Sequence, residues 1–259
     1  MYLSIHSDLH LEHKNIEEIN NLNIQYELNA NNAEYIILAG DISSLDNLEP
    51  FLNKISHHYK DKKIIYILGN HEYHKSFFED VVIKYKNICN KFSNVFLLNN
   101  NFLSDDENKV VFIGSTMWSD FNLANEQDKS IEFSKDKIID FFEIKSKINN
   151  DFINPEFMIN QFKESYNFIY ETIYNEKFND YKKIAITHFL PSDKVLHKIY
   201  HKSDSAYWCS NVEELVNEVD LWIYGHSHKN INSGKIICNQ RGNFDFPINN
   251  YEKDLIIKI

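Results

Sequence analysis

The sequence predicts an α/β fold in which buried strands alternate with amphipathic helices along a chain of 259 residues. Short apolar runs rich in β-branched residues, such as residues 64–68, have the length of buried strands. Stretches with apolar residues at helical spacing, such as residues 47–60, lie between these runs. Several apolar runs end in Asp, Asn or His, and strand ends are where α/β proteins bind ligands. No linker or repeat interrupts the chain, so we expect one domain over residues 1–259 with a polar site at its strand ends.

The composition is that of a globular protein and disfavours some partners. Hydrophobic residues make up 43% of the chain, charged residues 25%, and the formal net charge is −11. Because no Lys-rich run stands out, this charge disfavours a strong nucleic-acid surface. No apolar run is long enough to cross a bilayer, so we expect no membrane partner. A bound cation would offset a local cluster of carboxylates.

The N-terminus and the cysteines are typical of a cytoplasmic protein. Residues 1–6 lack the basic region and apolar stretch of a signal peptide. Cys89, Cys209 and Cys238 have neither disulfide nor zinc spacing, which indicates reduced and at least partly buried thiols. We expect a cytoplasmic location, and export by a route that reads no N-terminal signal stays open.

Three predicted strands in the first part of the chain end in polar side chains. They cover residues 2–6, 34–39 and 64–68. The polar residues that follow them are Asp8, His10, Asp41, Asn70, His71 and Glu72. Asp8 and His10 have strand spacing and can share one face. Asp41 could instead cap the helix that follows it.

Helices are expected over residues 47–60 and 76–91, each with apolar residues on one face. Two further apolar runs, at 95–98 and 109–113, are separated by the acidic stretch 104–108. This pattern predicts a hairpin at the surface.

Residues 115–180 differ in character from the rest and predict a helical insertion. Trp118 and Asp120 follow a strand, and residues 130–149 are charged. Asn154 and the proline after it form a good helix start, and the helix could run to about residue 175. We expect this insertion to cap the strand-end residues. Helices packed elsewhere on the sheet are the alternative.

The last part of the chain repeats the pattern of apolar runs followed by polar residues. Strands are expected over residues 183–186, 221–224, 235–238 and 254–259. The polar residues that follow the first three are His188, His226, His228 and Arg241. Taken alone, His188 could be a core histidine, and His226 with His228 could form a surface turn.

Together the strand ends supply oxygen and nitrogen donors and no thiolate, a set that suits Mn²⁺, Fe²⁺ or Zn²⁺, with manganese favoured. The donors are Asp8, His10, Asp41, Asn70, His71, His188, His226 and His228. They exceed the need of one tetrahedral ion. They fit two divalent ions about 3.5–4 Å apart, bridged by a carboxylate.

The order of these motifs resembles that of calcineurin-like metallophosphoesterases. The motifs are Asp8-x-His10, Gly40-Asp41, Gly69-Asn70-His71-Glu72, Thr187-His188 and Gly225-His226-x-His228. The resemblance implies a four-layer α-β-β-α sandwich, with two mixed sheets face to face, helices outside and metals at strand ends. It also implies roles, with Asp41 bridging two metals and His71 standing beside them. The first metal would be held by Asp8, His10 and His228, and the second by Asn70, His188 and His226.

Two further stretches resemble a bacterial branch of the same family. They surround Trp118 and Asp120 and, later, Arg241. The chain departs from the branch at Phe189, where a histidine is usual, and at Gln240, where a proline is usual. Neither is a metal position. Arg241 could contact substrate or form a buried ion pair that holds the C-terminal strand.

The expected activity is hydrolysis of a phosphate mono- or diester by a hydroxide that two metals activate. Asp41 and His71 are the expected catalytic residues, and His71 would give a hydrogen bond or proton to the phosphoryl or leaving oxygen. Glu72 would orient a neighbouring group. The acidic charge favours a phosphorylated small molecule or nucleotide as substrate. A phosphoprotein phosphatase or nuclease, and a non-catalytic metal-binding scaffold, are the alternatives.

Overall fold

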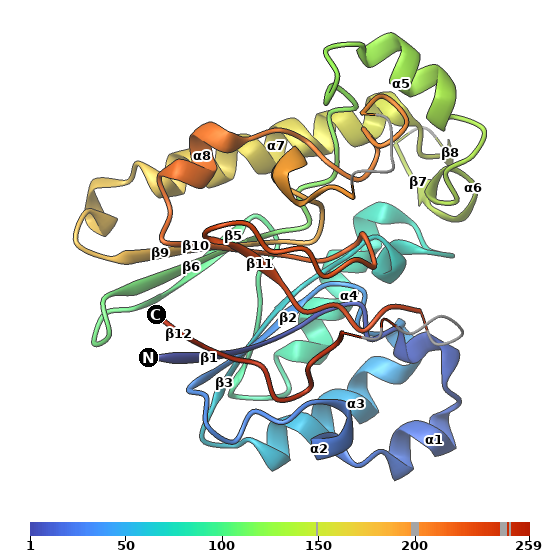
Figure 1. Cartoon of the computed structure of the whole chain (residues 1–259). Helices are drawn as coiled ribbons and strands as arrows, with labels where there is room; N and C mark the ends of the chain where they lie inside the picture. Colours follow the sequence, from blue (N-terminus) through green and yellow to red (C-terminus); the bar gives the residue numbers. More distant parts are fainter. Residues whose placement is uncertain (149, 198–201, 244–247, 249) are drawn as a thin grey trace.

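Two five-stranded sheets lie face to face in the computed structural model, with helices on their outer sides (Figure 1). The structure describes residues 1–148, 150–197, 202–243, 248 and 250–259. This architecture confirms the predicted α/β class and the two mixed sheets.

The first sheet has the strand order β12-β1-β2-β3-β4. Its strands are β1 (Tyr2–His6), β2 (Tyr35–Ala39), β3 (Lys63–Ile67), β4 (Val95–Leu97) and β12 (Ile256–Lys258). The first four strands run parallel, whereas β12 is antiparallel to β1. Helices cover the outer face of this sheet (Figure 1). They are α1 (Ile16–Asn21), α2 (Ile24–Glu27), α3 (Leu45–His58) and α4 (Phe78–Cys89).

The second sheet has the strand order β11-β10-β9-β6-β5. Its strands are β5 (Asn101–Asp105), β6 (Val110–Ser115), β9 (Lys182–Thr187), β10 (Leu221–Tyr224) and β11 (Ile236–Cys238). Only β5 is antiparallel to its neighbour. The outer face carries α7 (Pro155–Ile173) and α8 (Glu213–Asn217), as Figure 1 shows.

Alternate residues of each strand face different layers, which explains why the strands are apolar throughout. In β2, Tyr35 and Ile37 belong to the apolar layer between the sheets, whereas Ile36 and Leu38 pack toward the helices. Since both faces of a strand in a doubly covered sheet are buried, such strands are continuous apolar runs.

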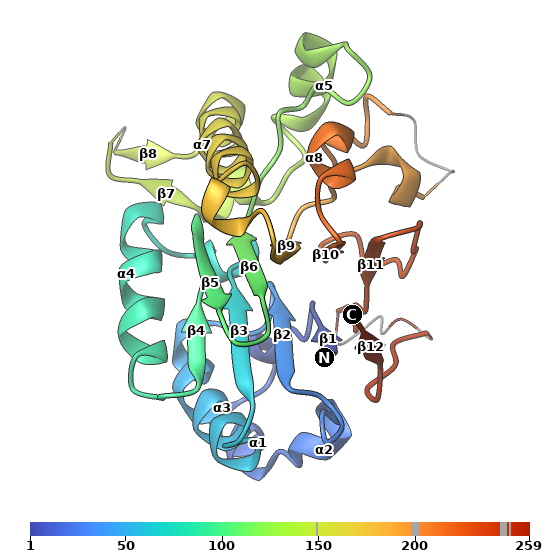
Figure 2. The same cartoon turned by 90° about the vertical axis from the view of Figure 1, so that its left-hand side faces the viewer.

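The predicted insertion, residues 115–180, consists of two structurally different parts. Its long helix, α7, packs over β6 on the second sheet. The preceding part holds the short helices α5 (Gln127–Ser134) and α6 (Asp140–Glu143) and the small sheet of β7 (Lys145–Ser146) and β8 (Asp151–Phe152). In Figure 2 this small sheet lies beyond one end of α4.

Short 3-10 helices complete the chain. They are η1 (Leu11–His13), η2 (His71–Tyr73), η3 (Glu176–Phe178) and η4 (Asp193–Val195). The three cysteines are free and buried, as predicted. None of the helices in the described residues is long and apolar enough to cross a membrane.

The predicted hairpin between residues 95–98 and 109–113 is wrong. The first run forms β4, which pairs in parallel with β3 in the first sheet. The partner of β6 is instead β5, which the sequence did not predict as a strand. β5 is a polar edge strand that is mostly exposed or half-buried, so it lacks the apolar pattern of the other strands.

Candidate metal centre

Five loops that each follow a parallel strand converge at one edge of the two sheets. They follow β1, β2 and β3 in the first sheet and β9 and β10 in the second. Parallel neighbours place their carboxyl ends on the same side of a sheet. The structure therefore gathers the side chains that the sequence predicted at strand ends: Asp8, His10, Asp41, Asn70, His71, His188, His226 and His228.

Five of these residues have a left-handed backbone although none is glycine. Their φ angles are 52° for Asp8, 46° for His10, 54° for Asp41, 74° for His226 and 48° for His228. A sparsely populated backbone conformation costs on the order of 1–3 kcal/mol for each residue and concentrates at functional sites. The loops are therefore shaped to aim side chains, against the local preference of the backbone.

Glycine is required before Asp41 and Asn70 because the backbone there is closely packed. A Cβ atom on Gly40 would overlap the ring of His188, and one on Gly69 would overlap the carboxylate of Asp41. Gly40 also has a φ angle of 85°, in the left-handed region that favours glycine.

Asp8, His10, Asp41 and His228 form what we call the first donor group. The Nε2 atoms of His10 and His228 are 3.0 Å apart. His228 Nε2 is 3.3 Å from Asp8 Oδ1, and His10 Nε2 is 3.9 Å from Asp41 Oδ2. Two imidazoles and two carboxylates thus direct their donor atoms at one small volume.

Asp41, Asn70, His188 and His226 form the second donor group, which shares Asp41 with the first. His188 Nε2 lies 3.2 Å from Asp41 Oδ2 and 3.2 Å from Asn70 Oδ1. His226 Nε2 is buried and has no hydrogen-bond partner in the described part of the chain. A buried polar atom without a partner is costly, and a bound cation would satisfy it.

Outer hydrogen bonds set which nitrogen of two histidines faces the donor groups. His188 Nδ1 is 2.9 Å from the carbonyl oxygen of Ala39, and His10 Nδ1 is 2.8 Å from Glu12 Oε1. In a neutral imidazole, an Nδ1–H that donates outward leaves the lone pair of Nε2 for a metal. The donor set, the tautomers and the unpartnered His226 Nε2 therefore fit divalent cations, and the role of each residue as a ligand stays a prediction.

The electrostatics of the second donor group reflect this crowding of acids and imidazoles. Burial alone would raise the pKa of Asp41, but the charges of His188 and His71 hold that pKa well below its usual value. Burial opposes protonation of His188, but the carboxylate of Asp41 raises its pKa to about 9. Burial and the nearby charge of His188 lower the pKa of His226, which favours the neutral form that ligates metals.

His71 lies beside the donor groups. Its Nδ1 is 3.1 Å from Glu12 Oε1, and its Nε2 is 4.0 Å from Asp41 Oδ2. Burial would lower the pKa of His71, but Asp41 and Glu12 raise it to about 10. One carboxylate oxygen of Glu12 thus contacts both His71 and His10, which the sequence analysis missed. Its position two residues after His10, in the pattern Asp8-x-His10-x-Glu12, is the signal that could have pointed to it.

Glu72 is buried and connects two of the loops. Its carboxylate accepts hydrogen bonds from the backbone N–H groups of Gly69, Asp41 and Ile42 at 2.7, 2.9 and 2.7 Å. Tyr66 donates a further hydrogen bond at 2.8 Å. Glu72 therefore fixes the loops after β2 and β3 relative to each other.

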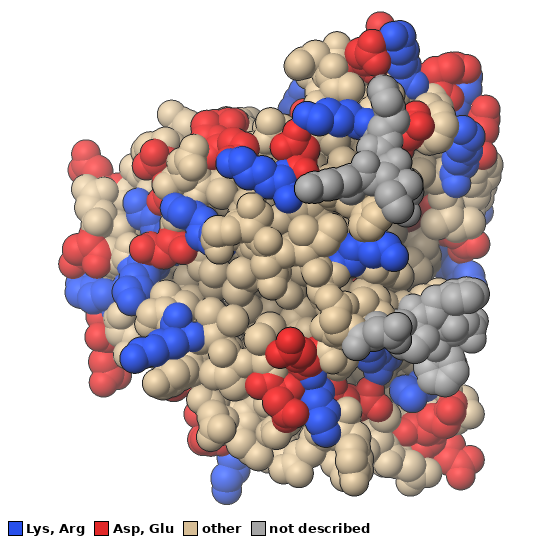
Figure 3. Space-filling view, viewed as in Figure 1, with Lys and Arg blue, Asp and Glu red and all other residues tan. Residues whose placement is uncertain are grey.

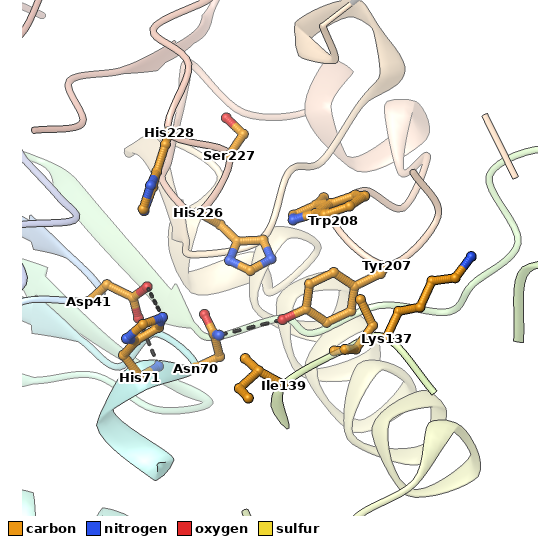
Figure 4. Close-up of a pocket in the computed structure, with 11 residues that line it drawn as sticks. Asp41, Asn70, His71, Lys137, Ile139, Tyr207, Trp208, His226, Ser227 and His228 are labelled. Carbon is orange, nitrogen blue, oxygen red and sulfur yellow. Dashed lines mark hydrogen bonds and ion pairs between the residues drawn. The ribbon is translucent and has the colours of Figure 1, made fainter. Parts of the chain in front are cut away.

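An open cleft of about 330 Å³ lies above the donor groups (Figure 4). In Figure 4, Asp41 and His71 lie at one end of this cleft and Trp208 and Lys137 at the other. The amino group of Lys137 lies over the ring of Phe133 and points away from the donors. The lining residues are Asp41, Asn70, His71, Lys137, Ile138, Ile139, Tyr207, Trp208, His226, Ser227 and His228.

Three predicted candidates lie outside this cleft as far as the described residues show. Trp118 is buried in the core against Tyr73 and Phe189. Asp120 accepts a hydrogen bond from Ser210 Oγ at 2.9 Å. Arg241 forms an ion pair with Glu27. Each of these three side chains therefore contacts residues that do not line the cleft. Glu27 is the last residue of α2, a short helix that the sequence analysis did not predict.

The two departures from the family pattern pack around the last two histidines. Phe189 is buried, with its ring 4.1 Å from the ring of His226. Gln240 accepts a hydrogen bond from the backbone N–H of His228 at 2.7 Å and donates to the carbonyl of Lys229 at 3.0 Å. Both support the His226–His228 turn, a role that sequence spacing did not predict.

Comparisons with known proteins agree with the observed fold. The family model for calcineurin-like phosphoesterases matches residues 5–230. The chain is 31% identical, over 278 residues, to uncharacterized protein L509 of Acanthamoeba polyphaga mimivirus, which covers 98% of this chain and 95% of the viral protein.

Two crystal structures share the fold at low sequence identity. The phosphopantetheinyl hydrolase PptH of Mycobacterium tuberculosis is similar with a TM-score of 0.69 and 14% identity, over 93% of this chain and 89% of that chain. A dimetal phosphatase of Danio rerio is similar with a TM-score of 0.53 and 10% identity, over 93% of this chain and 87% of that chain.

Proposed function

The chain belongs to the calcineurin-like phosphoesterase family, and from that premise we propose that it is a metal-dependent hydrolase of phosphate mono- or diesters, acting on a small molecule or nucleotide. The observation that carries the proposal is the pair of donor groups that share Asp41. An arrangement with one shared carboxylate suits two adjacent divalent cations, for which we favour Mn²⁺.

Two divalent cations held by these groups would lower the pKa of a water that attacks phosphorus and would offset charge on the phosphoryl oxygens. The chain itself contributes position and a proton donor. Glu12 holds the Nδ1 side of His71, while Nε2 faces Asp41, the residue common to both groups. From that position His71 can give a hydrogen bond or proton to the phosphoryl or leaving oxygen.

The cleft and the surface charge favour a small substrate. A volume of about 330 Å³ is at the lower end of the range for ligand pockets. On the face seen in Figure 3, basic side chains are interspersed with acidic ones, without a continuous basic track for nucleic acid. We further propose that the predicted insertion restricts substrate size, because its residues Lys137, Ile138 and Ile139 line the cleft.

A panel of substrates in Mn²⁺ tests this proposal. It contains an aryl monoester, an aryl diester, cyclic nucleotides, dinucleotides, a phosphopeptide and single-stranded DNA. A phosphopantetheinyl ester belongs in it because the mycobacterial protein of similar fold is named for that group. We expect the protein to hydrolyse the small esters, and we expect a chelator to abolish this activity.

Other results would contradict the proposal in distinct ways. Fastest turnover of the phosphopeptide or of DNA would replace the small substrate by a macromolecular one. Undiminished turnover by metal-stripped protein in chelator would refute the metal-dependent mechanism. No turnover of any substrate by protein with two bound cations would favour a non-catalytic metal-binding scaffold.

A further inference from the structure

Asp140 is a buried carboxylate that the predicted insertion brings to the edge of the second donor group. It is the first residue of α6 and is 0% exposed. Its Oδ1 accepts hydrogen bonds from His74 Nε2 at 2.8 Å and from Asn70 Nδ2 at 3.0 Å. Its Oδ2 accepts a hydrogen bond from the hydroxyl of Tyr207 at 2.6 Å.

These contacts determine which end of the Asn70 amide faces Asp140. An ionised carboxylate only accepts hydrogen bonds, so the amide nitrogen must face it. The Tyr207 hydroxyl donates to Asp140, which leaves its oxygen to accept from the same amide nitrogen at 3.4 Å, as drawn in Figure 4. The amide oxygen then faces His188 Nε2 at 3.2 Å.

We propose that Asp140 is a positioning residue that fixes the Asn70 amide so that its oxygen, and not its NH₂ group, belongs to the second donor group. The proposal rests on the proposed function, in which that group holds a cation. An amide turned by 180° would present an NH₂ group, which cannot ligate a metal. Because Asp140 belongs to the predicted insertion, correct docking of that segment becomes a condition for binding the second cation.

Two substitutions at one position separate orientation from charge. In Asp140→Asn, the new amide oxygen can take the place of Oδ1, and its NH₂ group can donate to the Tyr207 oxygen. Asp140→Leu has a similar size and no acceptor, so nothing holds the Asn70 amide. For Asp140→Leu we expect the affinity for the second Mn²⁺ to fall roughly 10–100-fold, the usual effect of losing a partner behind a ligand. The first Mn²⁺ should bind as before, and Asp140→Asn should restore most of the loss.

Asp105 provides the matched control. It is also a buried carboxylate, and it accepts hydrogen bonds from Tyr35 and Lys63 away from the donor groups. Asp105→Leu should lower the melting temperature while both Mn²⁺ ions bind with unchanged affinity. Calorimetric titration with Mn²⁺ alone gives the two affinities, and the melting temperature of metal-free protein reports folding.

A second comparison uses only isosteric changes and so avoids a variant that fails to fold. Asn70→Asp places a second carboxylate against Asp140, where two neighbouring carboxylates resist joint ionisation. Asp140→Asn should weaken the second site slightly in the wild-type background. In the Asn70→Asp background it should strengthen that site, because an amide again faces a carboxylate. This reversal of sign is the coupling that a purely structural Asp140 would not produce.

The outcomes distinguish the two proposals. If wild-type protein binds two Mn²⁺ ions, unchanged affinities in a folded Asp140→Leu, or the same direction of change in both backgrounds, overturn the role of Asp140 and leave the proposed function standing. Equal weakening of both sites would also overturn it, because the effect would be general. If wild-type protein binds fewer than two ions, the two-cation function fails and the inference fails with it.

Discussion

The two donor groups share Asp41 but differ in exposure and in what supports them. In the first group, the His228 side chain is 33% exposed, whereas in the second the His188 side chain is 0% exposed. The first is supported by nearby loop residues, Glu12 and Gln240. The second is supported from within the core and by Asp140 of the predicted insertion. The first donor group thus ends in a partly exposed histidine, whereas the second contains a fully buried one and depends on a residue of the predicted insertion.

Asp41→Asn should have the largest effect of all variants, because it should disrupt both donor groups. Its carboxylate is the only side chain common to both groups, so the loss of its charge weakens both cation sites. We expect loss of metal content and of nearly all turnover, measured by elemental analysis after dialysis and by ester hydrolysis. Retention of two cations and of activity would show that Asp41 does not bridge the groups.

His71→Gln should leave both donor groups intact and lower only the rate of the chemical step. We expect two bound cations and a kcat lowered by roughly 10²–10⁴, the range of general acid catalysis. The loss should be larger for poor leaving groups than for activated aryl esters, because only the former need a proton. An equal loss for all leaving groups would assign His71 to positioning, and loss of metal would make it structural.

The two cations should dissociate into a chelator at different rates, one rate for each donor group. Since the His228 side chain is partly exposed and the His188 side chain is buried, the first cation should leave faster than the second. Stopped-flow mixing of Mn²⁺-loaded protein with a chelator measures the phases. His228→Gln should speed only the fast phase, and His188→Gln should remove the slow one. A single phase that responds alike to both variants would mean that the groups do not differ.

The strand-end residues were predictable because their signals are local. Each apolar run has the length of a strand, and the next few residues carry the donor, as in β3 followed by Asn70 and His71. The two mixed sheets, in contrast, were predicted from the resemblance to the family and not from these local signals. The local signals failed for β5, whose polar edge position erases the apolar pattern.

The residues around the donors were not predictable because only tertiary packing brings them there. Asp140 and Tyr207 are 67 positions apart, and each is about that far or farther from Asn70. Nothing in their local sequence marks them as partners of a buried amide. Glu12 lies close to His10 in the chain, but its contact with His71 spans 59 positions. Local patterns thus identify the donors, whereas only the fold identifies what orients them.

Arg241 should have the smallest effect on the donor groups, since its guanidinium contacts Glu27 at the end of α2. The carbonyl of Glu27 accepts a hydrogen bond from Tyr251 at 2.7 Å, so the pair ties the C-terminal segment to the helices of the first sheet. Both side chains are 16% exposed, and lysine cannot reproduce the planar guanidinium. We expect Arg241→Lys to lower the free energy of unfolding by roughly 0.5–3 kcal/mol.

Thermal unfolding of metal-free protein measures that loss, and ester hydrolysis measures its functional counterpart. The control is Lys91→Ala, which removes an exposed ion pair with Glu49 and should cost about 0–1 kcal/mol. A raised KM with an unchanged melting temperature would mean that Arg241 reaches the substrate. No change in either quantity would make it a surface residue. We expect neither of these two results. Arg241, the only arginine of the chain, is largely buried beside the carboxylate of Glu27. Its backbone N–H donates a hydrogen bond to the carbonyl of Ser7, the residue before Asp8. Arg241→Lys should therefore destabilise the segment next to Asp8, while kcat and KM stay unchanged.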